Sequence, residues 1–187
     1  MTRMKDSGIE WIGEVPEDWG ITKLKYICRM QSGNNLTSLE ISSENDGGKI
    51  FPVYGGNGIV EYVDSYNDEN TIIVGRVGAY CGSVYLEQGI CWVSDNAIFA
   101  KSKITKDEFF DYFLLKRLNL FNHHVGTGQQ LLTQEILNNI EVPKPVTEQI
   151  ELFNRKATSI FETIFTNSRE IIRLQELSDL LLSRLAG

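Results

Sequence analysis

The chain has 187 residues, of which 42% are hydrophobic and 23% charged, a composition that excludes intrinsic disorder and predicts one globular domain with room for an appendage. No apolar run reaches the roughly 18 residues that span a bilayer, and the charged N-terminus lacks the apolar core of a signal peptide. The net charge of −7 argues against indiscriminate binding to nucleic acid or anionic membrane, although specific DNA binding needs only a local basic face.

The first 143 residues alternate short apolar segments with glycine-containing turns, which predicts a mixed α/β domain. We expect strands at 71–77, 83–86, 90–93, 96–100 and 140–142. A helix is expected over 106–120, with Phe109, Tyr112, Phe113 and Leu120 on its apolar side, and Thr133 is expected to cap a short helix that runs through Leu137.

The chain changes character near Pro143, because no proline follows Pro145 and no glycine follows it until Gly187. Residues 144–187 therefore predict one long helix, with Thr147 as N-cap and a length of about 58 Å over residues 147–185. A heptad repeat that starts at Ile150 has apolar residues at nine of its eleven a and d positions, broken by Asn167 and Ser178, which is typical of a coiled coil.

We expect this helix to pair with another helix and to form an antiparallel homodimer, since a long apolar stripe is unfavourable in water. The alternative is a terminal helix folded back on its own domain. The residues expected at the dimer interface are Ile150, Phe153, Ile160, Ile164, Ile171, Leu174, Leu181 and Leu185.

Two glycine-rich segments, 54–58 and 75–82, are candidates for contact with another surface, because glycine lets the backbone approach closely. A third segment, 126–130, adds two glutamines, and a basic run begins at Lys101. These side chains suit phosphate and base-edge contacts, whereas tight turns that hold a curved sheet are the alternative role of the glycines. The candidate DNA-facing residues are Tyr54, Asn57, Arg76, Tyr80, Lys101, Lys103, Gln129 and Gln130.

Enzyme and metal signatures are missing from the sequence. There is no glycine-rich loop ending in Gly-Lys-Ser/Thr, no complete dinucleotide fingerprint, no base-methylation element and no carboxylate–lysine cluster. The two histidines, His123 and His124, are adjacent and point apart on a helix or a strand, so a shared metal is not expected. Cys28, Cys81 and Cys91 are odd in number, and we expect buried free thiols in a cytoplasmic protein.

Several segments resemble one half of the specificity (S) subunit of type I restriction–modification systems. The opening Asp6-Ser-Gly-Ile-Glu-Trp-Ile-Gly-Glu-Val-Pro-Glu-Asp-Trp19 is similar to the start of that family. The runs Pro52–Gly58, Ile73–Gly82 and Trp92–Asn96 are similar to parts of its target-recognition domain. Val142-Pro-Lys-Pro-Val-Thr-Glu-Gln149 resembles the junction to its conserved helix.

The resemblance implies an α+β fold, with a target-recognition domain over 1–143 that has a curved, glycine-rich sheet, and one long coiled-coil helix over 144–187. It implies a non-catalytic subunit that reads half of a bipartite site in double-stranded DNA. S-adenosylmethionine and ATP would be used by the modification and restriction subunits that are its partners, with no cofactor bound directly. The family has two domains and two helices, so this chain resembles a half subunit, natural or truncated. A coiled-coil adaptor that binds a protein partner is the alternative.

Overall fold

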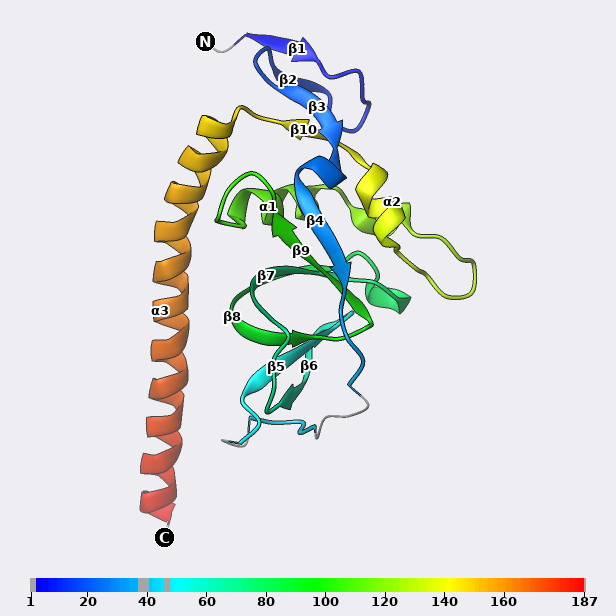
Figure 1. Ribbon diagram of the computed structural model, residues 1–187. Helices are drawn as coiled ribbons and strands as arrows, with labels where there is room; N and C mark the ends of the chain where they lie inside the picture. The colour runs from blue at the N-terminus through cyan, green and yellow to red at the C-terminus, as the bar shows by residue number, and fades with distance from the viewer. Residues whose placement is uncertain (1–2, 37–40, 46–47, 187) are drawn as a thin grey trace.

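The computed structural model describes residues 3–36, 41–45 and 48–186, and Figure 1 shows an α+β domain with one long helix along its side. Two small antiparallel sheets lie at the end of the molecule that holds the N-terminus. In the first, β1 (Met4–Asp6) pairs with β2 (Glu14–Pro16). In the second, β3 (Gly20–Lys23) pairs with β10 (Glu141–Lys144), so the start of the chain is joined to the segment that precedes the long helix.

The main sheet has six strands in the order β4-β9-β7-β8-β5-β6. Neighbouring strands are antiparallel except for β5 and β8, which are parallel. The strands are β4 (Cys28–Ser32), β5 (Phe51–Gly55), β6 (Gly58–Val63), β7 (Asp68–Gly75), β8 (Val84–Val93) and β9 (Ala97–Ser102).

The sheet is strongly curved, as the sequence predicted. Just beyond the edge strand β4, the amide of Asn34 donates to the carbonyl of Val93 at 2.9 Å, although Val93 ends β8, three strands away in the sheet order. The curve gives the sheet an inner and an outer face, both apolar along the central strand β7. Ile73 packs inward with Val93 and Ala97, whereas Ile72 and Val74 pack outward beneath the helices. A strand that is buried on both faces has a continuous apolar run in its sequence, and this pattern predicted β7.

Two short helices cover the outer face of the sheet. The first, α1 (Phe109–Arg117), is shorter than the helix predicted over 106–120. The left-handed backbone of Asn119 (φ 45°) stops α1, and the 3-10 turn η3 (Leu120–His123) follows. The second, α2 (Gln134–Asn139), begins as predicted, because the Thr133 hydroxyl accepts a hydrogen bond from the amide of Ile136 at 3.1 Å.

The long helix α3 (Thr147–Ala186) has 40 residues, about 60 Å at 1.5 Å per residue. Its first hydrogen bonds are accepted by the carbonyl of Val146, so the predicted N-cap at Thr147 is one residue too late. The start of α3 is tied to the N-terminal segment, because Trp19 Nε1 donates to Gln149 Oε1 at 2.6 Å.

The first half of α3 packs on α1 through aromatic rings. Phe161 lies 4.6 Å from Phe109, centroid to centroid, and Phe153 lies 5.8 Å from Phe113. Ile150 and Ala157 of the same helix are also buried. The expectation that Ile150 lies at a dimer interface is therefore wrong, because its side chain is only 1% exposed within its own chain.

The three cysteines are free and buried, as the sequence predicted. Residues 83–86 and 90–93 were expected as two strands but form one continuous strand, β8. The remaining predicted strands correspond to β7, β9 and β10. The residues Glu87, Gln88 and Gly89 between its two apolar parts resemble a turn in the sequence but continue the strand.

Candidate nucleic-acid interface

Four loops meet at one end of the main sheet and bring most of the glycine-rich segments together. They are the turn between β5 and β6 (55–58), the segment after β7 (75–82), the turn between β8 and β9 (94–96) and the loop before α2 (126–130). We call them the loop cluster. The amide of Arg76 donates to the carbonyl of Asn96 at 3.0 Å, and the amide of Gly78 donates to the carbonyl of Gln130 at 3.0 Å.

Gly75 shows why the cluster needs glycine. A Cβ atom at Gly75 would lie 2.5 Å from the carbonyl oxygen of Tyr80 and 2.7 Å from that of Gly56. No side chain fits at such distances, so two loops can cross only because this residue has none. The structure therefore gives this glycine the alternative role, a tight crossing of two loops, and contact with another surface stays a prediction.

Arg76 lies half-buried at the centre of the cluster. Its Nη1 donates weakly to the Ser32 hydroxyl at 3.4 Å, and the amide group of Gln134 contacts the same hydroxyl at 2.9 Å. Among the described residues, Arg76 Nε is buried and has no hydrogen-bond partner. Ser32 and Gln134 were not predicted as site residues, because nothing in their local sequence indicates contact with a residue far along the chain.

Exposed polar side chains cover the outside of the loop cluster. Asn57 lies at the tip of the β5–β6 turn, Tyr80 is 52% exposed on the 3-10 turn η2 (Gly78–Tyr80), and Gln129 is exposed on the loop before α2. Gln130 is half-buried beside them. The structure therefore gathers five of the eight predicted residues (Asn57, Arg76, Tyr80, Gln129 and Gln130) at one end of the sheet.

Tyr54 is a correction to the predicted site. It belongs to strand β5 and not to a loop, and its ring is buried in the inner core. Its hydroxyl donates to Glu87 Oε2 at 2.9 Å. Burial and the neighbouring Glu87 carboxylate raise the pKa of Tyr54 well above its usual range. This side chain stabilises the sheet and is not available to DNA.

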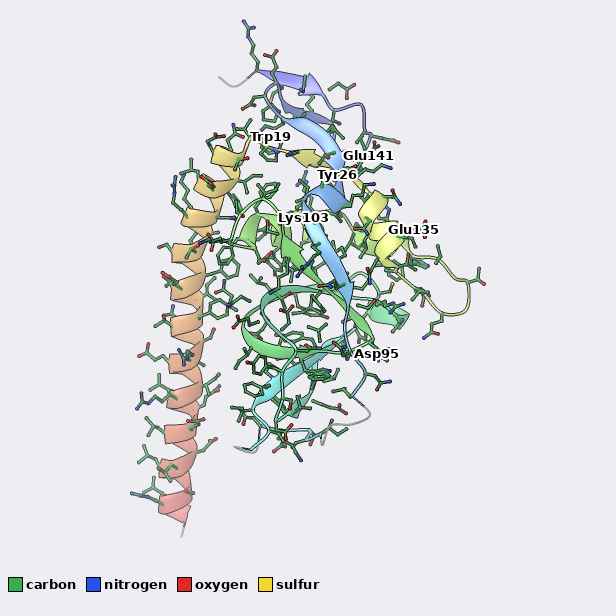
Figure 2. All side chains as sticks on the ribbon, in the orientation of Figure 1. Trp19, Tyr26, Asp95, Lys103, Glu135 and Glu141 are labelled. Atoms are coloured by element: carbon green, nitrogen blue, oxygen red, sulfur yellow. The ribbon has the colours of Figure 1, made fainter. Side chains whose placement is uncertain are left out.

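Lys101 and Lys103 lie away from the loop cluster, so the structure does not bring them together with the other predicted residues. Lys101 Nζ pairs with Asp68 at 3.1 Å and donates to the carbonyls of Glu69 and Asn70. Lys103 Nζ donates to the carbonyl of Lys25 at 2.6 Å. Both residues lie at the far end of β9, whose first residue adjoins the cluster, and Figure 2 shows Lys103 well separated from Asp95 in the β8–β9 turn.

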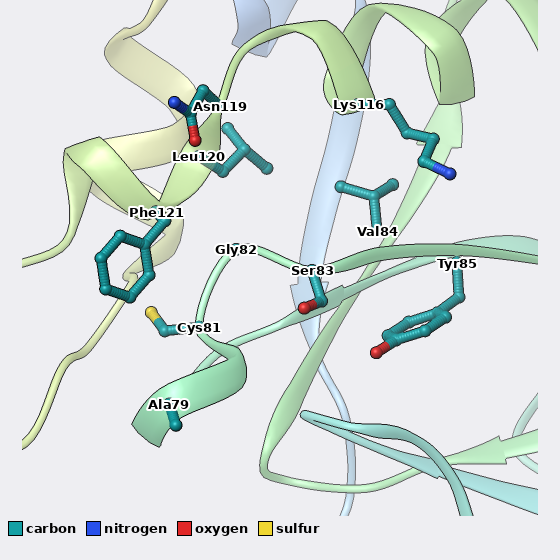
Figure 3. A pocket seen from close by; sticks show the side chains of 10 residues that line it. All are labelled: Ala79, Cys81, Gly82, Ser83, Val84, Tyr85, Lys116, Asn119, Leu120 and Phe121. Atoms are coloured by element: carbon teal, nitrogen blue, oxygen red, sulfur yellow. The ribbon is translucent and has the colours of Figure 1, made fainter.

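A pocket of about 450 Å³ adjoins the loop cluster on the side of α1. Figure 3 shows it between the Ala79–Tyr85 segment and the end of α1 with η3. Its lining includes the aromatic rings of Tyr85 and Phe121, the amide of Asn119 and the ammonium of Lys116. Gly82 lines it with a backbone φ of +86°, which side chains rarely tolerate. The pocket thus places an exposed cation and an aromatic ring next to the predicted loops.

The described residues contain no group of three histidine, cysteine or acidic side chains that could hold a metal ion. No helix within 3–36, 41–45 and 48–186 is both long and apolar enough to cross a membrane.

The family model for the type I restriction modification DNA specificity domain matches residues 16–180. The chain therefore belongs to this family, as the resemblance predicted. The match covers the main sheet, the loop cluster and most of α3.

Curated relatives agree with this assignment. The EcoprrI specificity subunit of Escherichia coli is 24% identical over 81% of this chain and 38% of its own length. The MjaVIII specificity subunit of Methanocaldococcus jannaschii is 27% identical over 85% of this chain and 43% of its own length. The chain thus spans about two fifths of the length of these relatives.

Solved structures share the fold. The S subunit of the type I restriction–modification system from M. genitalium superposes with a TM-score of 0.58 at 19% identity, over 81% of this chain and 43% of its own. The HsdS subunit from Thermoanaerobacter tengcongensis superposes with a TM-score of 0.58 at 15% identity, over 86% of this chain and 41% of its own. The α+β fold with one long C-terminal helix is thus the fold of one half of these chains.

Proposed function

We propose that this chain reads one half of a bipartite site in double-stranded DNA through the loop cluster. The observation that carries the proposal is the convergence of four loops from distant parts of the chain, with Arg76 at their centre and Asn57, Tyr80 and Gln129 exposed around it. Amides, a guanidinium and a phenol can reach base edges and phosphates, and glycine lets the backbone approach them closely. Membership in a DNA specificity domain family supports this role.

The chain itself performs no chemistry in this proposal. It directs a modification subunit, which uses S-adenosylmethionine, and a restriction subunit, which uses ATP, to the DNA site in the cytoplasm. The similarity of its fold to S subunits, and to a protein described as part of the assembly of a type I system, supports these partners. A homodimer formed through α3 would supply the second recognition domain.

DNA binding tests the proposal through two lysines of equal charge. Lys116 lies in the pocket beside the loop cluster, and Lys103 lies at the far end of β9. Lys116→Ala should weaken binding to the preferred site and, if Lys116 contacts a phosphate, flatten the slope of log affinity against log salt by about 0.9. The matched control Lys103→Ala should change neither quantity.

Tyr80→Ala separates base or sugar contact from charge, because it should weaken binding without changing the salt slope. Fluorescence anisotropy with labelled duplexes over a salt series measures all three variants, and thermal unfolding checks that each is folded. Equal losses in Lys116→Ala and Lys103→Ala would place the DNA face elsewhere. Absence of any salt-dependent DNA binding by the wild type, with or without the modification subunit, would favour the protein-binding adaptor.

A further inference from the structure

The two ends of α3 have different surroundings. Ile150 and Ala157, the first two a positions of the heptad repeat, are buried against the domain. From Ile160 onward the a and d side chains are exposed, with Ile164 at 48%, Ile171 at 56% and Leu181 at 62%. An undistorted helix rotates a heptad stripe by about 20° per repeat, which explains why the stripe leaves the domain as α3 proceeds.

The free part of the stripe is long enough for a helix pair of its own. Every described side chain from Thr166 to Leu185 is exposed, so the chain does not cover its own distal leucines. The interval from Ile160 to Leu185 spans about 38 Å at 1.5 Å per residue. An apolar stripe of this length in water favours a helical partner.

The two polar residues in the stripe specify how a second copy fits. We propose that the distal halves of α3 from two copies pair antiparallel over residues 160–185, with Asn167 of each copy opposite Ser178 of the other. In this register Ile171 lies opposite Leu174, Ile164 opposite Leu181, and Ile160 opposite Leu185 of the second copy. Every apolar residue then meets an apolar residue, and the two polar side chains meet each other.

Other antiparallel registers are less favourable. A shift of one heptad in one direction sets Asn167 against Ile171 and Ser178 against Ile160 of the second copy. A shift in the other direction sets Asn167 against Leu185 and Ser178 against Leu174. A buried amide without a polar partner destabilises the pair. A single polar residue of this kind is known to fix the register of a coiled coil. Registers that use Ile150 also require a side chain that is already buried in its own domain.

This inference rests on the proposed homodimer, and the two can fail separately. Light scattering of the full chain first measures whether its molar mass is that of a dimer. The double variant Ile164→Asp, Ile171→Asp should have the mass of a monomer. A monomeric wild type at micromolar concentration overturns both the homodimer and the register. DNA binding is measured separately and does not depend on this result.

Disulfide trapping measures the register. Asn167→Cys and Ser178→Cys replace only the polar residues of the stripe, and the natural cysteines are buried, so the wild type is the control. In the proposed register, position 167 of one copy lies about 16 Å along the helix from position 167 of the other, whereas a disulfide needs Cα atoms within about 7 Å. Each variant alone should therefore stay uncrosslinked, and an equimolar mixture should form a covalent dimer on oxidation.

Two outcomes overturn the register while leaving the homodimer intact. Crosslinking of Asn167→Cys with itself indicates a parallel pair in which like residues face each other. A mixture that forms no covalent dimer, although light scattering shows dimers, indicates a different antiparallel register or a different interface.

Discussion

Asp111 lies in surroundings that are unfavourable for its charge. It lies on α1 and is 1% exposed, and its two carboxylate oxygens have no hydrogen-bond partner among the described residues. Burial raises the pKa of Asp111 to about 6, although nearby Ser102 and Cys28 partly offset the effect. Burial also raises the pKa of Glu108, one turn earlier, to about 7. Near neutral pH the domain therefore carries buried negative charge at a cost in stability.

The sign of the pH dependence follows from these raised values. A carboxyl group whose pKa is higher in the folded state binds its proton more tightly there, so its stabilising effect is full below the unfolded pKa and is lost as pH rises through the folded pKa. We expect Asp111→Asn to raise the free energy of unfolding at pH 8 by on the order of 2 kcal/mol. The loss of stability between pH 4.5 and pH 8 should also be smaller in this variant.

Urea unfolding at several pH values measures this effect. Asp95→Asn is the matched control, because Asp95 is exposed in the β8–β9 turn and its replacement should leave the pH profile unchanged. If Asp111→Asn and wild type lose stability in parallel between pH 4.5 and pH 8, the Asp111 carboxyl group does not titrate in this range.

Local sequence predicted some residues of the candidate site and not others. Asn57, Tyr80 and Gln129 were found because glycine-rich turns expose their side chains. Tyr54 was misplaced because the strand β5 extends further into its glycine run than the pattern indicates. The ion pair of Lys101 with Asp68 of a neighbouring strand was not predictable. Contacts between distant segments decide such cases, and no local pattern contains them.

Among the elements, α3 was the most predictable, because its periodicity extends over many turns. Which part of its surface the domain covers was not predictable, since that depends on where α1 lies. Asn154 illustrates the point, because it lies outside the a and d positions of the repeat but is only 1% exposed. Its Oδ1 accepts a hydrogen bond from the amide of Phe110 at 2.8 Å, and its Nδ2 donates to the Thr105 hydroxyl at 2.8 Å.

Asn154 should therefore hold α3 against the segment that leads into α1. We expect Asn154→Ala to lower the free energy of unfolding by about 1–3 kcal/mol, since it leaves the partly buried amide of Phe110 without a partner. Hydrogen exchange should show faster exchange at Phe110, while the distal turns of α3 remain unchanged.

The control for this prediction is Glu170→Ala, which removes an exposed side chain from the distal half of the same helix. Equal stability of Asn154→Ala and Glu170→Ala would mean that the aromatic contacts with Phe153 and Phe161 alone hold the helix in place.

At the scale of the whole molecule, the relatives are more than twice as long as this chain, yet its fold matches about two fifths of theirs. Two copies related by a twofold axis would present the loop cluster twice in opposite orientations. The family assignment was predictable from the motifs, whereas the distance between two domains depends on the helix register. In the proposed dimer, Asn167 and Ser178 specify that register within the part of α3 that the domain leaves uncovered.

A twofold dimer predicts an interrupted palindrome as the preferred DNA site, with two inverted half-sites around a non-specific spacer. Because the paired part of α3 separates the two domains, its length should set the spacer. One extra heptad inserted after Ile171 keeps Asn167 opposite Ser178 of the second copy and lengthens the paired segment by about 10.5 Å. The preferred spacer should then grow by about three base pairs, at 3.4 Å per base pair.

Selection from a random DNA pool, in the presence of the modification subunit, measures the spacer for the wild type and the insertion variant. Three base pairs also turn the second half-site by more than a quarter of the 10.5-base-pair turn, so the variant should bind more weakly as well as at a longer spacing. An insertion after Leu185, beyond the paired segment, is the matched control and should leave the spacer unchanged. Recovery of a single asymmetric motif without a spacer would mean that one copy reads DNA alone or beside a different subunit.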